Sequence, residues 1–195
     1  QFTVELSDPT STRQIVLNTS SDILSEKDVR IALQHATNKQ NISDGIFYGL
    51  EKPADTLFAS TVPYCDIELE PYVYDLELAG QILDEAGWKM GSGNVREKDG
   101  QPLNIDLLYN SDSVTEKSIA EYLQSEYQSI GVSLNIHGEE EQSYRDNMKA
   151  GNFDMVFNIC WGTPYDPQSS LAAMRAPVYG DYAAQLGLDD KAEID

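Results

Sequence analysis

The chain has 195 residues, 41% of them hydrophobic, which is long enough for one large domain with its own core. Its 33 acidic and 13 basic residues give a formal net charge of −20. Such a surface repels phosphate groups, which argues against nucleic acid and anionic membranes as partners. Excess carboxylates favour a dispersed, monomeric protein; weak attraction of cations is the alternative. The apolar runs are strand-sized, so no membrane-spanning helix is expected.

The two ends of the sequence carry no clear boundary signals. Gln1 leads directly into mixed sequence without a signal peptide, so either the protein is cytosolic or the sequence begins downstream of its targeting segment. At the other end, residues 181–195 are polar and lack a capped element. They are typical of a chain cut before its natural stop.

The two cysteines, Cys65 and Cys160, are far apart in the sequence. Because no C-x-x-C pair exists, a thiolate zinc site and a thioredoxin-like motif are excluded. A disulfide between them requires Cα atoms within about 7 Å, which the sequence leaves open. Cys160 lies within an apolar strand pattern and fits a small buried thiol.

The first third of the chain predicts one strand and two helices. An apolar strand at 13–18 is followed by helical spacing over 26–38, preceded by Ser25 in a pattern resembling a capping box. A shorter helix is expected at 41–48. Residues 51–74 then lose all periodicity and contain three prolines. A stretch of this kind is either functional or an extended surface strap held by its aromatic side chains.

Strands and helices alternate over the rest of the chain. The predicted elements are a helix capped by Asp75 and closed by Gly87, a hairpin at Asp99-Gly100, strands at 103–109, 132–136 and 153–160, and helices at 114–130 and 142–150. This alternation predicts an α/β fold in which helices cover a sheet.

Catalytic motifs are largely missing from the sequence. It has no G-x-S-x-G, Walker or strand-linked G-x-G-x-x-G pattern. Of its two histidines, His35 lies beside an apolar helix stripe and fits a partly buried structural role. His137 precedes Gly-Glu-Glu-Glu, a cluster that suits either metal ligation or the dipole of the following helix. No helix carries two histidines at metal spacing.

The run from Phe153 to Pro167 is the strongest functional signal. An apolar strand stops at a loop that contains Trp161, Tyr165, one glycine and two prolines. In open α/β sheets, ligands bind at the carboxyl ends of strands. This loop, together with Tyr144 and Arg145 before it and Arg175 and Tyr179 after it, is therefore the candidate ligand-binding set. Ordinary aromatic packing is the alternative.

Several segments resemble the nickel-binding proteins of bacterial ABC importers, within the peptide/nickel/opine solute-binding family. They are residues 54–59, 62–64, 96–103, 138–141, 161–167, 170–171 and 174–177, and the helix 29–38 with 46–49 fits the wider family. The resemblance implies a two-lobe fold of the periplasmic-binding-protein type II class, with a mixed sheet covered by helices. Residues 1–195 then form a single α/β lobe of a longer protein.

Within that lobe, residues 1–24 are expected to be an entry strand and linker, 25–180 the main lobe and 181–195 a truncated exit segment. The resemblance further implies an extracytoplasmic protein, periplasmic or lipid-anchored, with its signal outside this chain. It would be a monomer that delivers its ligand to ABC transporter permease subunits.

The ligand implied by the resemblance is nickel held by a small chelator, without a catalytic cofactor or enzymatic activity. Trp161 and Tyr165 match positions that line the chelate site. A further pocket tyrosine of the family falls at Arg145, beside Tyr144, and the family's metal-ligating histidine falls near Tyr179. Direct imidazole coordination of the metal from this loop is therefore not expected. A peptide or metal–opine ligand is the alternative, and a hydrolase using Glu139, Asp166 and Asp181 is the different-class alternative.

Overall fold

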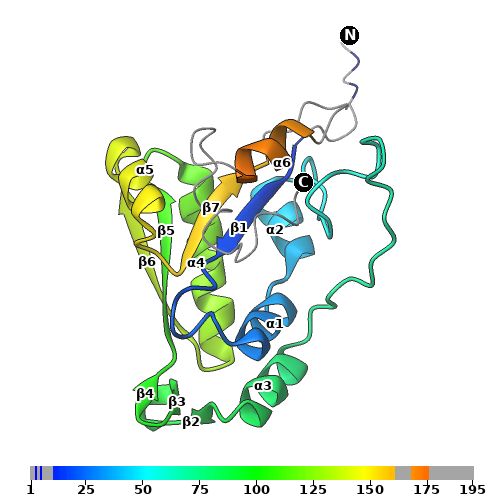
Figure 1. The fold of residues 1–195 in the computed structure, drawn as a ribbon. Coiled ribbons are helices and arrows are strands. Elements are labelled where there is room, and N and C mark those ends of the chain that lie inside the picture. Colours follow the sequence, from blue (N-terminus) through cyan, green and yellow to red (C-terminus); the bar gives the residue numbers. More distant parts are fainter. Residues whose placement is uncertain (1–2, 4, 6–10, 161–167, 176–195) are drawn as a thin grey trace.

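The computed structural model describes residues 3, 5, 11–160 and 168–175 (Figure 1). Its main feature is a four-stranded sheet in the order β1 (Arg13–Leu17), β7 (Met155–Ile159), β5 (Asn104–Asn110) and β6 (Ser133–Glu139). The strand β5 runs parallel to both β6 and β7, whereas β1 pairs antiparallel with β7. The predicted α/β class and the mixed sheet are confirmed.

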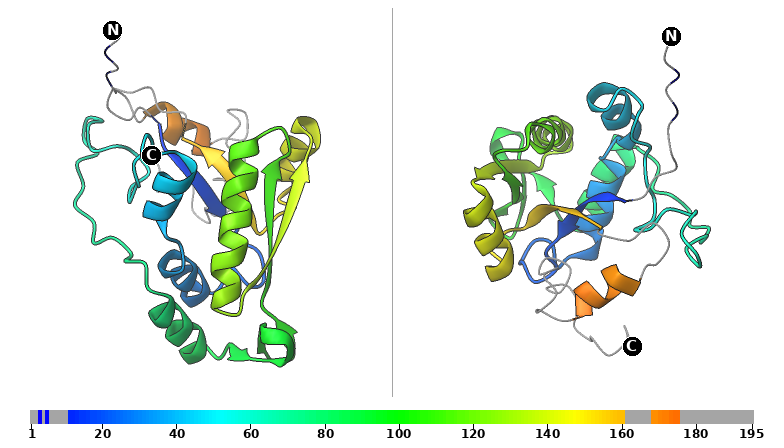
Figure 2. Two further views of the ribbon diagram at one scale, coloured as in Figure 1. Left: turned by 180° about the vertical axis from the view of Figure 1, so that it is seen from behind. Right: turned by 90° about the horizontal axis from the view of Figure 1, so that it is seen from above.

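Helices cover both faces of this sheet (Figure 2). Side chains of successive strand residues point to opposite faces. On one face, Ile105 and Leu107 pack in the large core with α4 (Val114–Ser129). On the other face, Leu108 joins a smaller core beneath α5 (Glu141–Ala150). The sheet is therefore the middle layer of the molecule.

Three further helices complete the large core. These are α1 (Lys27–His35), α2 (Lys39–Ile46) and α3 (Leu76–Glu85), and α1 packs closely against α3. Between α2 and α3 the chain runs through residues 47–75 without a helix or strand, along the outside of the molecule (Figure 1). The predicted strap is therefore present as an extended segment. We call residues 47–75 the strap.

The strap is held by contacts from the helices at both of its ends. His35 Nδ1 donates to the Val73 carbonyl at 2.7 Å, and the His35 ring meets the Tyr72 ring edge-on with centroids 5.3 Å apart. Near the other end, the Ser43 hydroxyl donates to the Glu51 carbonyl at 2.5 Å. The structural role predicted for His35 is thus to hold the strap.

A second, small sheet lies at the end of the molecule opposite the carboxyl ends of the parallel strands (Figure 1). It consists of β2 (Lys89–Met90), β3 (Arg96–Lys98) and β4 (Gln101–Pro102), with the short 3-10 helix η1 (Ser92–Asn94) between β2 and β3. Asp99 and Gly100, with φ of 53° and 81°, form the turn from β3 to β4. Two left-handed residues define the hairpin turn that Asp-Gly predicts.

The predicted start of the first helix was wrong. The residue before α1 is Glu26, and the Ser25 hydroxyl donates instead to the Asp22 carbonyl at 2.8 Å, within the preceding turn. The Glu26 carboxylate is occupied elsewhere, because it accepts from Lys98 Nζ at 2.7 Å and from Trp88 Nε1 at 3.3 Å. Helix α1 therefore begins without a side-chain cap.

The boundary between the first two helices also differs from the prediction. Asn38, expected inside the first helix, has a non-helical backbone (φ −82°, ψ 87°), and its side chain accepts from the backbone N–H of Asn41. An N-cap residue lies outside the helix that it caps. The first helix therefore ends at His35, and the second begins at Lys39 rather than Asn41.

Neither Cys65 nor Cys160 forms a disulfide, so the bond left open by the sequence is absent. Cys160 is 3% exposed, as its position in an apolar strand predicted. Within the described ranges, none of the helices has the length and apolar character needed to cross a bilayer. The last described helix is α6 (Gln168–Arg175).

Arg96 joins the small sheet to the helices around it. Its side chain is 7% exposed; Nε donates to the Ile130 carbonyl at 2.7 Å, and Nη1 donates to the Trp88 carbonyl at 2.6 Å. Nη1 also contacts Asp84 Oδ1 at 2.8 Å, and this hydrogen bond holds the pKa of Asp84 below its usual range. One cation thus satisfies carbonyls from two helix ends.

We expect Arg96→Met to lower the free energy of unfolding by about 3 kcal/mol, because two buried carbonyls lose their donor. Urea unfolding at neutral pH measures the change. Arg145→Met is the matched control, since Arg145 is 70% exposed on α5 and its loss should change stability by less than about 0.5 kcal/mol. Equal losses in the two variants would contradict the role given to Arg96.

Candidate functional site

The carboxyl ends of the three parallel strands meet at one edge of the main sheet. There β5 ends at Asn110, β6 at Glu139 and β7 at Ile159. The antiparallel strand β1 begins at the same edge, with Arg13 opposite Ile159. β7 and Cys160 lead to residue 161, so the predicted ligand loop 161–167 follows a strand end of the kind at which parallel sheets bind ligands. We call this region the carboxyl edge.

Asn110 links the first turns of two helices at the carboxyl edge. Its backbone N–H donates to Glu116 Oε2 at 2.9 Å, and its side-chain amide donates to Glu141 Oε2 at 2.5 Å. Glu116 lies in the first turn of α4 and Glu141 in the first turn of α5. Carboxylates at these positions are favoured by the helix dipoles. Two helix starts are therefore held side by side with their negative side chains.

Burial raises the pKa of the Glu116 carboxyl, and the nearby Glu141 carboxylate raises it further. The hydrogen bond from Asn110 and the positive charge of Arg13 act in the opposite direction but do not offset burial. Among the described carboxyl groups at this edge, Glu116 therefore binds its proton more tightly than a free glutamate does.

Tyr144 lies at the carboxyl edge with its side chain turned into the protein. It is 8% exposed, and its hydroxyl donates to the Phe157 carbonyl at 2.5 Å. Burial raises the pKa of this phenol above its ordinary value, with further contributions from Glu116 and Glu141. The Tyr144 ring belongs to the small core beneath α5, and its hydroxyl proton is directed to the β7 backbone.

Arg145 has the opposite environment from its neighbour. Its side chain is 70% exposed and forms an ion pair with Glu141 one helical turn earlier. An exposed guanidinium with a carboxylate partner is able to exchange that partner for a ligand carboxylate, because both pairs use the same planar geometry. Of the predicted site residues whose side chains are described, Arg145 is the one available to a ligand.

The His137 cluster does not converge on a single point. His137 Nε2 lies 3.2 Å from Asp106 Oδ1, on the neighbouring strand, whereas Glu139 Oε2 accepts from the Ser143 hydroxyl at 2.8 Å. Glu141 occupies the first turn of α5, where the helix dipole favours a carboxylate. In the part of the chain that the structure describes, no group of three or more His, Cys, Asp or Glu side chains is placed to hold a metal ion.

The remaining predicted site residues fall outside what the structure describes. Trp161, Tyr165 and Tyr179 lie in undescribed segments, as do Asp166 and Asp181 of the hydrolase alternative. Arg175 ends α6, and only its backbone is described. The structure therefore brings Tyr144 and Arg145 to the edge from which the aromatic loop departs.

Sequence reasoning missed Asn110 and Glu116 at this edge. A signal was available for Glu116, because Ser113 and Glu116 have the spacing of a capping box immediately before an apolar helix. The Ser113 hydroxyl does accept from the Glu116 N–H at 3.2 Å. Nothing local marks Asn110, since its importance depends on the distant start of α5.

The fold and this edge define a class of protein. A model of the bacterial extracellular solute-binding proteins, family 5 (middle region), matches residues 1–181, and the chain belongs to this family. Its architecture is that of type II periplasmic binding proteins. The oligopeptide-binding protein AppA from Bacillus subtilis, solved with a nonapeptide, shares the fold with a TM-score of 0.71 at 21% identity over 91% of this chain and 42% of that one.

Within the family, the chain is similar to nickel-binding members. It is 42% identical to the nickel-binding periplasmic protein of Escherichia coli K12 over all 195 residues, which is 37% of that protein. NikA from Brucella suis, solved with Fe(III)-EDTA, matches with a TM-score of 0.89 and 47% identity over 98% of this chain and 39% of that one. NikZ from Campylobacter jejuni, solved with Ni(L-His), matches with a TM-score of 0.77 and 25% identity over 91% of this chain and 36% of that one. The chain thus spans less than two-fifths of these relatives.

Glu116 gives the carboxyl edge a measurable pH signature. Because its pKa is raised in the folded state, the folded protein binds this proton more tightly than the unfolded chain does. Its contribution to stability therefore falls as pH rises from about 4, the unfolded value, through the folded pKa. We expect the stability difference between Glu116→Gln and the parent to move in favour of the variant between pH 3 and pH 7.

Urea unfolding at a series of pH values measures this difference. Glu121→Gln, which removes an exposed negative charge from the same helix, controls for the change in net charge. If Glu116→Gln and Glu121→Gln differ from the parent by the same amount at every pH, burial of Glu116 does not raise its proton affinity.

Proposed function

We propose that this chain forms one lobe of an extracytoplasmic solute-binding protein that captures nickel as a small-molecule chelate for an ABC importer. The observation that carries the proposal is the 42% identity to a nickel-binding periplasmic protein along all 195 residues. It is supported by two structural neighbours that hold metal chelates, Fe(III)-EDTA in one and Ni(L-His) in the other. The function is capture and delivery, so the proposed protein is not an enzyme and uses no catalytic cofactor.

The chelate would bind at the carboxyl edge, between this lobe and a second one. Trp161 and Tyr165 would offer aromatic faces and a phenol to the chelator, and Tyr179 a hydroxyl. Arg145 and Arg175 would meet chelator carboxylates, with Arg145 exchanging its Glu141 partner. Tyr144 would support the loop from beneath through its bond to Phe157.

Metal specificity in this proposal comes from the chelator rather than from protein ligands. No histidine lies near Tyr179 in the sequence. The aromatic residues would recognise the shape and charge of a preformed complex, as stacking and phenol groups recognise small polar ligands. Closure of two lobes around the chelate would follow from contacts that both lobes make with it.

A peptide or metal–opine ligand is the second candidate. The family includes the oligopeptide-binding protein OppA of Lactococcus lactis, which is 27% identical over 165 residues, 79% of this chain and 27% of that protein. Tyr179 at the position where the resemblance places a histidine favours a ligand that needs no imidazole. In either case the protein would be a monomer, periplasmic or lipid-anchored, with permease subunits as partners.

Calorimetry on the protein with both lobes tests the ligand class, using Ni(L-His)₂, free Ni²⁺ and a tripeptide. We expect the nickel–histidine complex to bind, and Trp161→Ala to weaken it at least about thirtyfold, because buried aromatic anchors contribute about 2 kcal/mol or more. Tyr64→Ala is the control, since Tyr64 is a 94% exposed aromatic residue of the strap and should leave affinity unchanged.

Two outcomes would overturn the proposal. Tight tripeptide binding without any heat from the nickel complexes would assign the protein to the peptide branch. Nickel binding that is unaffected by Trp161→Ala would place the metal site away from the carboxyl edge.

A further inference from the structure

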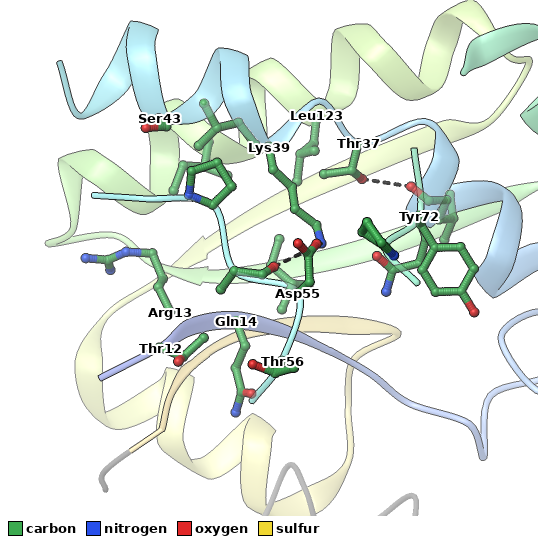
Figure 3. Close-up of a pocket in the computed structure, with 18 of the residues that line it drawn as sticks. Thr12, Arg13, Gln14, Thr37, Lys39, Ser43, Asp55, Thr56, Tyr72 and Leu123 are labelled. Atoms are coloured by element: carbon green, nitrogen blue, oxygen red, sulfur yellow. Dashed lines mark hydrogen bonds and ion pairs between the residues drawn. The ribbon is translucent and has the colours of Figure 1, made fainter. Parts of the chain in front are cut away.

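A cavity of about 440 Å³ lies beneath the strap, on the α4 side of the main sheet (Figure 3). Its walls come from β1, from α1 and α2, from α4, and from strap residues 51–57 and 69–72. This volume is typical of sites that enclose a small organic ligand.

The cavity lies on a different face of the sheet from Tyr144. Ile15 and Leu17 of β1 line it, and they pack with the large core beneath α4. Val16, between them, packs with the small core that contains Tyr144. Since successive strand residues point to opposite faces, the sheet separates the two places. Arg13 marks the end of the cavity nearest the carboxyl edge.

The floor of the cavity is apolar. Leu123 of α4 and Met155 and Phe157 of β7 contribute to it, and all three are at most 2% exposed. Phe47, at the end of α2, adds an aromatic wall over which the Arg13 guanidinium lies, 5.4 Å from the ring centroid. Because these three floor side chains are already covered by protein, the apolar surface open to a hydrocarbon or aromatic group is that of the half-buried Ile15, Leu17 and Phe47.

Positive charge is concentrated around the cavity. Four of the chain's 13 basic residues line it, against three of its 33 acidic residues. The four are Arg13, Arg30, Lys39 and Lys52. On a chain of net charge −20, this is a local excess of cations. Four positive and three negative side chains give the lining a net charge of +1, which favours an anion there over the rest of this acidic surface.

Two of the three acidic residues are already neutralised. Arg13 Nη2 contacts Glu51 Oε1 at 3.2 Å, and Lys39 Nζ contacts Asp55 Oδ1 at 2.8 Å. Lys52 lies between these pairs in the strap, and among the described residues it has no ion pair. The side-chain amide of Gln34 adds hydrogen-bonding groups to the lining.

The roof of the cavity is held in place before any ligand arrives. Lys39 Nζ donates to the Ala54 carbonyl at 3.0 Å as well as to Asp55 (Figure 3). At the far side, Tyr72 is packed against His35. A roof that is already ordered loses little further conformational entropy on binding.

We propose that this cavity is a binding site for a small organic anion with an apolar body, such as an arylalkyl monocarboxylate. The body lies on Ile15, Leu17 and Phe47, and the carboxylate lies at the rim beside Lys52. The site is independent of the nickel-chelate function and is formed wholly by described residues of this chain.

Calorimetry on the full chain with three probes of one shape tests this proposal. The probes are 3-phenylpropionate, 3-phenylpropanol and 3-phenylpropylamine. We expect the carboxylate to bind at least about tenfold more tightly than the amine, with the alcohol between them, because only the head-group charge differs. Equal affinities, or no heat from the carboxylate at millimolar concentration, would overturn the proposal.

Two variants locate the binding. Lys52→Glu reverses the exposed rim charge and should weaken the carboxylate about three- to tenfold. Lys117→Glu, an exposed cation on α4 outside the cavity lining, is the matched control and should leave it unchanged. Carboxylate binding that falls equally in both lysine variants would place the ligand elsewhere.

Discussion

Parallel pairing of β5 with both of its neighbours is the constraint on which the rest of this lobe depends. A parallel strand can be reached only by a crossover, so α4 must connect β5 to β6 and α5 must connect β6 to β7. The two crossover helices then cover opposite faces and give the sheet its two cores. The same pairing brings three strand ends and two helix starts to one edge. The position of the candidate site thus follows from topology before any particular side chain is considered.

Local chemistry made much of this fold predictable from sequence. The Asp99-Gly100 turn, the Asp75 cap and the alternating apolar residues of β5 each act over a few residues, and the structure contains all three. The misplaced helix boundaries depend on which of several neighbouring polar residues forms the cap. Ser25 donates back to the Asp22 carbonyl, and Asn38 caps the second helix. The contacts of Glu26 with Trp88 and Lys98, more than 60 positions away, are what no local pattern contains.

In the candidate site, too, some features follow from local sequence and others depend on distant contacts. The strand end, the α5 helix and the exposed Arg145 follow from periodicity and spacing. The link from Asn110 to Glu116 and Glu141, by contrast, exists only because β5 and β6 lie side by side. The cavity beneath the strap is less predictable still, since its walls come from five separate stretches of sequence. The ligand proposed for the site rests on similarity to relatives, because neither periodicity nor charge identifies a ligand.

The hydrogen bond from Tyr144 to Phe157 has a mechanical consequence. It ties the middle of α5 to the third residue of β7, four positions before Trp161. The hydrogen bond holds α5 and β7 together, and the small core around it shields it from water. Substitutions in the segment that follows β7 can therefore change ligand preference without changing the packing of α5 against β7. A scaffold of this kind allows ligand preference to diverge between relatives without loss of the underlying sheet.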